Sequence, residues 1–214
     1  MNRLNKIEVV KGLIKQSKFV KAEIILRDIP NSDKNPEVQQ LLGVVAFQTN
    51  RVSEAVVYFQ KAAIDLPKDG YLQNNLAQSY KILGFLDEAK LAFKNAAKYQ
   101  TRFADPLNHL GLLLMQEGEE EQAETAFLAA ISRHPKYAEA HYNLGVLLGK
   151  LNRLVEAREH YQQAVRAKPD YTQALNNLGV VLDSLGEYKA AEKIYRKVIL
   201  TSPNIPELHC SLGS

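Results

Sequence analysis

The sequence predicts an all-α protein built as an α-solenoid of antiparallel helix pairs. A 34-residue pattern recurs five times without a gap, and each copy holds two apolar segments at helical spacing. The composition, 46% hydrophobic and 24% charged, is that of a globular chain with ample helix-forming residues. Because a period of this length is typical of solenoids, we expect each repeat to bury its apolar face against its neighbours.

The copy at residues 138–171 shows why each half forms a helix and where the helices end. Gly145 lies inside the first helix, where glycine costs about 1 kcal/mol relative to alanine, so it needs a packing reason. We expect small residues there to let two helix backbones approach, with Tyr161 filling the space between them. Pro169 lacks an amide hydrogen and disfavours helical geometry before it, so the second helix must stop just upstream.

The same register runs through residues 36–69, 70–103, 104–137, 138–171 and 172–205. The place of a residue is counted from the start of its repeat. Places 7 and 8 hold leucine and a small residue, place 20 alanine, place 24 an aromatic residue and place 32 proline. The place-24 residues are Phe59, Phe93, Phe127, Tyr161 and Tyr195. Thr101 replaces the proline once, so we expect the turn from Gln100 to Phe103 to be the loosest junction.

Both ends of the array depart from the pattern. Residues 3–35 match only the second helix of a repeat, which predicts a degenerate capping repeat. Residues 206–214 begin a sixth copy that stops after Leu212 and Gly213. We expect a fragment of a longer protein there, although the stub could be the cap itself or Gly-Ser a cloning remnant. The open end exposes Leu208 and Leu212, so we also expect self-association through it.

The repeat closely resembles the tetratricopeptide (TPR) unit, on the evidence of Leu144, Gly145, Ala157, Tyr161 and Pro169 at their places. The resemblance covers about nine-tenths of the chain. It implies a right-handed TPR superhelix, whose first helices line a concave groove. It also implies a scaffold that holds another protein chain.

In such a groove, places 2, 5, 6, 9, 12 and 13 would face the partner. An asparagine carries both donors and an acceptor, so a spaced row can pair with an extended peptide whatever its sequence. Asn75, Asn143 and Asn177 form such a row, which resembles the asparagine ladder in the TPR array of protein O-GlcNAc transferase. The alternative is that these asparagines bond neighbouring helices or meet water. The candidate groove residues are Asn74, Asn75, Gln78, Asn108, His109, Leu112, Tyr142, Asn143, Val146, Asn176, Asn177 and Val180, with Val44, Phe47 and Met115 adding apolar area.

Composition argues against several other classes of protein. The net charge of +3 gathers in residues 1–35, which hold eight basic and four acidic residues, so no basic stripe for nucleic acid follows the array. No apolar segment is long enough to insert into a membrane or to form a signal peptide. The single Cys210 fits a reducing compartment, so we expect a cytoplasmic protein.

Catalytic and metal-binding patterns are also missing from the sequence. His141 and His160 lie in one predicted hairpin and could approach each other, but a metal site needs further ligands. No phosphate loop, nucleophile motif or paired-acid pattern occurs, so we expect no enzyme activity, no cofactor and no metal. The first hypothesis is a non-catalytic scaffold that binds an extended or helical partner segment in its groove. The alternative is the N-terminal substrate-recognition array of a larger enzyme, a glycosyltransferase or sulfotransferase, with its catalytic domain beyond residue 214.

Overall fold

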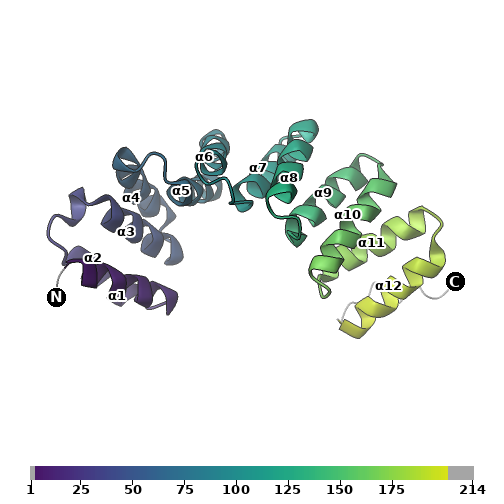
Figure 1. Ribbon diagram of the computed structural model, residues 1–214, viewed down its shortest axis with the longest axis horizontal. Coiled ribbons are helices and arrows are strands. Elements are labelled where there is room, and N and C mark those ends of the chain that lie inside the picture. The colour runs from purple at the N-terminus through teal and green to yellow at the C-terminus, as the bar shows by residue number, and fades with distance from the viewer. Residues whose placement is uncertain (1–2, 202–214) are drawn as a thin grey trace. The chain divides into compact units, whose positions relative to one another are not determined.

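The computed structural model describes residues 3–201, which form twelve α-helices and one short 3-10 helix (Figure 1). The helices of the N-terminal half are α1 (Arg3–Lys15), α2 (Phe19–Arg27), α3 (Pro36–Gln48), α4 (Val52–Asp65), α5 (Gly70–Leu83) and α6 (Leu86–Tyr99), with η1 (Ser32–Lys34) before α3. Those of the C-terminal half are α7 (Asp105–Gln116), α8 (Glu120–Arg133), α9 (Ala138–Lys150), α10 (Leu154–Ala167), α11 (Thr172–Ser184) and α12 (Tyr188–Thr201). The described residues contain no strand, which confirms the all-α prediction.

The chain divides into two compact units, Met1–Pro106 and Leu107–Ser214. Consecutive helices such as α3 with α4, or α9 with α10, pack as antiparallel pairs, and each pair contacts its neighbour inside the unit (Figure 1). This is the predicted solenoid of helix pairs. The division between the units follows shortly after the turn in which Thr101 replaces proline.

Each predicted repeat from residue 36 to residue 205 holds one of these helix pairs. The expected sixth copy, residues 206–214, lies outside the described residues, as do Leu208, Leu212 and Cys210. No helix within residues 3–201 is both long enough and apolar enough to cross a membrane.

A left-handed residue at place 15 turns the chain between the two helices of every repeat. Its backbone φ is positive at Asn50, Gly84, Gly118, Asn152 and Gly186. These are the residue types that reach the left-handed region at the least steric cost. Ser17, with a φ of 57°, occupies the same place in the degenerate repeat at residues 3–35. The amide of the next residue then donates back to the first helix, as in Arg153 N to Leu148 O at 2.9 Å, which closes a Schellman-type cap.

The glycine at place 8 packs against the aromatic ring at place 24, which confirms the predicted reason for its presence. A Cβ atom added to Gly145 would lie 2.7 Å from Cε1 of Tyr161, and one added to Gly111 would lie 2.6 Å from Cε1 of Phe127. Phe59, Phe93 and Phe127 are among the largest fully buried side chains. At these glycines the ring therefore occupies the volume that a side chain at place 8 would need.

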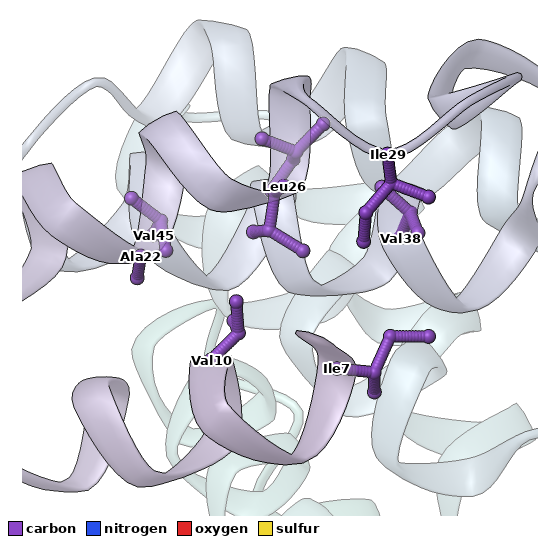
Figure 2. Packing of buried hydrophobic residues seen from close by; sticks show 8 residues of the cluster. Ile7, Val10, Ala22, Leu26, Ile29, Val38 and Val45 are labelled. Carbon is purple, nitrogen blue, oxygen red and sulfur yellow. The ribbon is translucent and has the colours of Figure 1, made fainter. Parts of the chain in front are cut away.

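An apolar cluster packs the degenerate repeat against its neighbour. Figure 2 shows Ile7 and Val10 of α1 close to Ala22 and Leu26 of α2 and to Val38 of α3. All of these side chains are at most 2% exposed. Burial of one such aliphatic side chain contributes about 1.5–3 kcal/mol, so the cluster anchors α1 and α2 even though residues 3–35 depart from the repeat pattern.

His141 of α9 and His160 of α10 form a hydrogen-bonded pair inside one hairpin. Their Nδ1 atoms are 3.0 Å apart, and Nε2 of His141 lies 3.1 Å from the carbonyl oxygen of Pro135. Because a carbonyl only accepts, Nε2 of His141 carries a hydrogen, and its Nδ1 accepts from Nδ1–H of His160 in the neutral pair. A second proton on the two facing Nδ1 atoms would break this bond.

Burial lowers the pKa of both histidines below the ordinary value of 6.5. A charge on His141 lowers the pKa of His160 further, while the carboxylates of Glu159 and Glu156 on α10 and Glu124 on α8 act in the opposite direction. The neutral pair is therefore the form that the folded hairpin favours.

We expect Gly12→Ala and Gly145→Ala to have opposite effects on stability. A Cβ on Gly12 meets no atom within 4 Å, so this variant should gain about 0.5–1 kcal/mol from helix propensity. Gly145→Ala receives the same gain but overpacks against Tyr161 at a cost of about 1–3 kcal/mol, so it should be less stable than the parent. Urea unfolding followed by circular dichroism measures both, and equal stabilisation in the two variants would contradict the packing described above.

We expect the C-terminal unit to lose stability as the pH falls. Because the folded pKa values of His141 and His160 lie below the unfolded value, the unfolded state binds more protons, and stability decreases as the pH drops below about 6.5. His160→Asn retains a donor near the Nδ1 position and does not titrate, so the slope should flatten in this variant. The matched control is His134→Asn at an exposed position. Melting temperatures between about pH 7.5 and pH 5 provide the test, and an unchanged slope in His160→Asn would show that the pair is not responsible.

Candidate functional site

In the N-terminal unit, the predicted groove residues of α3 and α5 meet at one pocket. It has a volume of about 140 Å³ and is lined by Val44, Phe47, Gln48, Phe59, Asn75 and Gln78. Four of these were predicted to face the groove: Val44, Phe47, Asn75 and Gln78. The remaining two are Gln48 of α3 and Phe59 of α4, whose ring edge packs against Gly43 of α3. The pocket thus lies where two neighbouring first helices and one second helix meet.

The amide side chains around this pocket have no hydrogen-bond partner among the described residues. Among residues 3–201, the side chains of Gln48, Asn75 and Gln78 make no hydrogen bond to another residue. Each amide offers two donor hydrogens and an acceptor oxygen. Because the neighbouring wall is apolar, the pocket combines a surface for burial with several uncommitted hydrogen-bonding groups.

In the C-terminal unit, two members of the predicted asparagine row bond to other side chains of the protein. Nδ2 of Asn143 donates to Oδ1 of Asn108 at 2.9 Å, which joins α9 to α7. Nδ2 of Asn177 donates to the hydroxyl oxygen of Tyr161 at 3.3 Å, which joins α11 to α10. Asn143 and Asn177 thus bond to neighbouring helices, as the alternative to peptide binding predicts. Within the described residues, the side chain of Asn75 makes no such bond.

Two of the asparagines at place 5, Asn74 and Asn108, are buried, whereas Asn176 is partly buried, as are the asparagines at place 6. Asn74 and Asn108 are 6% and 4% exposed. The Oδ1 atoms of Asn74 and Asn176 are buried and accept no hydrogen bond from the described part of the chain. Tyr142 holds place 5 in the fourth repeat, and its ring centroid is 5.1 Å from that of Tyr171. Place 5 thus contributes mainly to packing between helices.

The other predicted groove residues lie on first helices of the C-terminal unit. His109 and Leu112 are partly buried on α7, Val146 is partly buried on α9, and Val180 on α11 is 58% exposed. These side chains do not line the pocket of the N-terminal unit.

Sequence reasoning missed two residues of the pocket, Phe59 and Gln48. Gln48 occupies place 13, which was expected to face the groove, so its place was a usable signal. Phe59 was treated only as a packing residue. The overlooked signal is that place 24 is phenylalanine in one repeat, at Phe59, and tyrosine in another, at Tyr161. The Tyr161 hydroxyl accepts a hydrogen bond from Asn177, whereas Phe59 has no hydroxyl to offer Asn75.

The chemistry of the pocket is that of binding. Its lining side chains are amides, aliphatic groups and phenyl rings, which act through hydrogen bonds and burial rather than proton transfer. Within residues 3–201, no group of three or more histidine, cysteine, aspartate or glutamate side chains could hold a metal ion.

Comparison with known proteins gives the family and the fold. The model of the family described as "Tetratricopeptide repeat" matches residues 109–172 and 148–205. The chain has no significant match among the curated proteins.

Several solved structures share the fold at low sequence identity. PilF of Pseudomonas aeruginosa has a TM-score of 0.82 at 18% identity, over 97% of this chain and 95% of that chain. YrrB, described as a TPR protein with an unusual peptide-binding site, has a TM-score of 0.68 at 20% identity, over 91% of this chain and 95% of that one. MamA from Desulfovibrio magneticus has a TM-score of 0.67 at 20% identity, over 84% and 97% of the two chains.

The family match and the shared register of glycine, alanine and aromatic places agree with these structural likenesses. Residues 109–205 match the tetratricopeptide repeat family, and the chain shares the fold of solved tetratricopeptide repeat proteins.

Proposed function

We propose that this chain is a non-catalytic scaffold that binds an extended or helical segment of a partner protein along its first helices. The observation that carries the proposal is the pocket between α3 and α5, where four predicted groove residues converge. The uncommitted amides of Asn75 and Gln78 lie there beside the apolar side chains of Val44 and Phe47. This combination suits a peptide, which presents both a polar backbone and side chains that gain from burial.

Amide side chains support binding that does not depend strongly on the partner's sequence. Each peptide unit carries one donor and one acceptor, and an asparagine or glutamine side chain can pair with both. The apolar wall adds about 25 cal/mol for each Å² of apolar surface removed from water. We infer that the amides bind the backbone of the partner peptide, while the pocket selects one of its side chains.

The structural relatives support the same role without identifying a partner. YrrB is described as having a peptide-binding site, and Cut9 is described in a hetero-tetramer with Hcn1. Both share the repeat fold with this chain at 24% identity or less. For this chain we propose a protein or peptide partner bound by the N-terminal unit, since Asn143 and Asn177 of the C-terminal unit already use an amide hydrogen internally.

We expect Asn75→Ala and Asn143→Ala to separate binding from stability. The Asn75 side chain makes no hydrogen bond within residues 3–201, so its removal should leave stability within about 0.5 kcal/mol of the parent. Peptide affinity should fall by about threefold to tenfold through the loss of one or two hydrogen bonds. Asn143→Ala removes the bond to Asn108 and should lower the free energy of unfolding by about 0.5–1.5 kcal/mol.

The binding probe is a displayed library of random peptides, selected on the parent protein and re-measured on both variants by fluorescence anisotropy. Urea unfolding gives the stabilities. If no peptide is enriched on the parent, the proposed function is wrong. If enriched peptides bind Asn75→Ala as tightly as the parent, their site lies elsewhere on the chain.

A further inference from the structure

The pocket at Phe59 differs from its counterpart in the fourth repeat by one hydroxyl group. Phe59 and Tyr161 both hold place 24, and each ring packs by its Cδ1–Cε1 edge on the place-8 glycine of its own repeat. Asn75 follows Phe59 by the same sixteen residues that separate Asn177 from Tyr161. The two rings therefore hold equivalent positions. Tyr161 carries an oxygen that bonds to Asn177, whereas Phe59 carries none that could bond to Asn75.

This difference explains why a pocket remains at Phe59 and why the Asn75 amide is uncommitted. Where Tyr161 directs its hydroxyl toward Asn177, Phe59 ends in a carbon atom, and the space beside Asn75 forms part of a pocket of about 140 Å³. A dry cavity of about 150 Å³ in another protein accommodates a benzene molecule, so this volume suits a leucine, methionine or phenylalanine side chain.

On the first helices α1, α3 and α5 of the N-terminal unit, the described charged side chains without an ion pair are basic. On α1 and α3, Lys11 lies 3.0 Å from both Glu8 and Glu37, which leaves these two carboxylates paired. Lys15 in the last turn of α1 and Lys81 in the last turn of α5 make no ion pair within the described range. Lys81 follows Gln78 by three residues and thus lies one helical turn beyond the pocket on the same face of α5. A bound segment would therefore meet positive charge beside the pocket.

We propose that the Phe59 pocket is a specificity pocket for one apolar side chain of a partner segment that carries acidic residues beside it. The apolar side chain enters between Val44, Phe47 and Phe59. The amides of Asn75 and Gln78 pair with the adjoining peptide backbone, and Lys81 attracts the acidic flank. This inference rests on the proposed function, to which it adds the chemistry of the partner.

The test closes the pocket with the residue that the chain itself uses in its fourth repeat. Phe59→Tyr places a hydroxyl toward Asn75, as Tyr161 does toward Asn177, and so narrows the pocket and engages the amide without disturbing the ring on Gly43. The matched control is Phe127→Tyr, the same exchange at the same place in the C-terminal unit, where Asn143 is already bonded to Asn108. Circular dichroism and thermal unfolding establish that both variants fold.

Displayed random peptides are selected on the parent, sequenced and measured on each variant. We expect the enriched peptides to share an apolar residue flanked by aspartate or glutamate. Their affinity should fall by about tenfold or more in Phe59→Tyr and stay unchanged in Phe127→Tyr, because burial of one aliphatic side chain accounts for at least that factor. Lys81→Glu should remove the preference for acidic flanks. If Phe59→Tyr does not fold, Phe47→Ala replaces it, with the same expected loss of affinity.

The contrary outcomes separate the two levels of the proposal. Peptides that bind the parent and Phe59→Tyr equally well would overturn the pocket while leaving the scaffold function standing. Enriched peptides with basic flanks, or with no shared apolar residue, would overturn the partner chemistry. A selection that enriches nothing on the parent would overturn both the scaffold function and this inference.

Discussion

The repeats depend on one close contact, in which the aromatic ring at place 24 packs on the backbone of the place-8 glycine. At Gly145 the ring of Tyr161 occupies the position that a Cβ atom would take. The contact fixes the distance between the two helices of a pair and therefore the surface that the pair offers to the next repeat. In the second repeat Ala77 holds place 8, opposite Phe93, so that hairpin must accommodate one additional methyl group.

The same contact also governs the surface on which binding is proposed. The hydroxyl of Tyr195 donates to Asp183 of its own repeat, but the far end of the Tyr161 ring lies at the place-6 residue of the next repeat. A hydroxyl there engages the asparagine, as Tyr161 engages Asn177, whereas a bare ring leaves Asn75 uncommitted beside a pocket. With the hydroxyl oxygen, the asparagine has a structural role. Without it, the asparagine is a candidate for binding a partner.

The degenerate repeat and the histidine pair show how the array accommodates departures from its pattern. Residues 3–35 lack the leucine–glycine pair, yet Ser17 adopts the same left-handed turn, and Ile7 and Val10 still reach the apolar cluster with α3. His141 and His160 replace apolar contact inside a hairpin by a hydrogen bond that requires the neutral pair. In both places a local interaction, the apolar cluster or the histidine hydrogen bond, holds the helix pair together. The repeat pattern of the sequence does not predict either interaction.

The sequence by itself determined the helix pairs, their order and the reason for Gly145, because these depend on spacing within one repeat. It also identified Asn75, Gln78, Val44 and Phe47 as residues of one face. Only the tertiary structure decided which of the asparagines are committed, since Asn143 bonds to Asn108, thirty-five residues away in the preceding repeat. It alone showed that Phe59 lines a pocket while Tyr161 bonds to Asn177. These hydrogen bonds and this pocket form between repeats, where atoms of separate helices meet. The periodic pattern of the sequence describes each repeat alone and does not predict them.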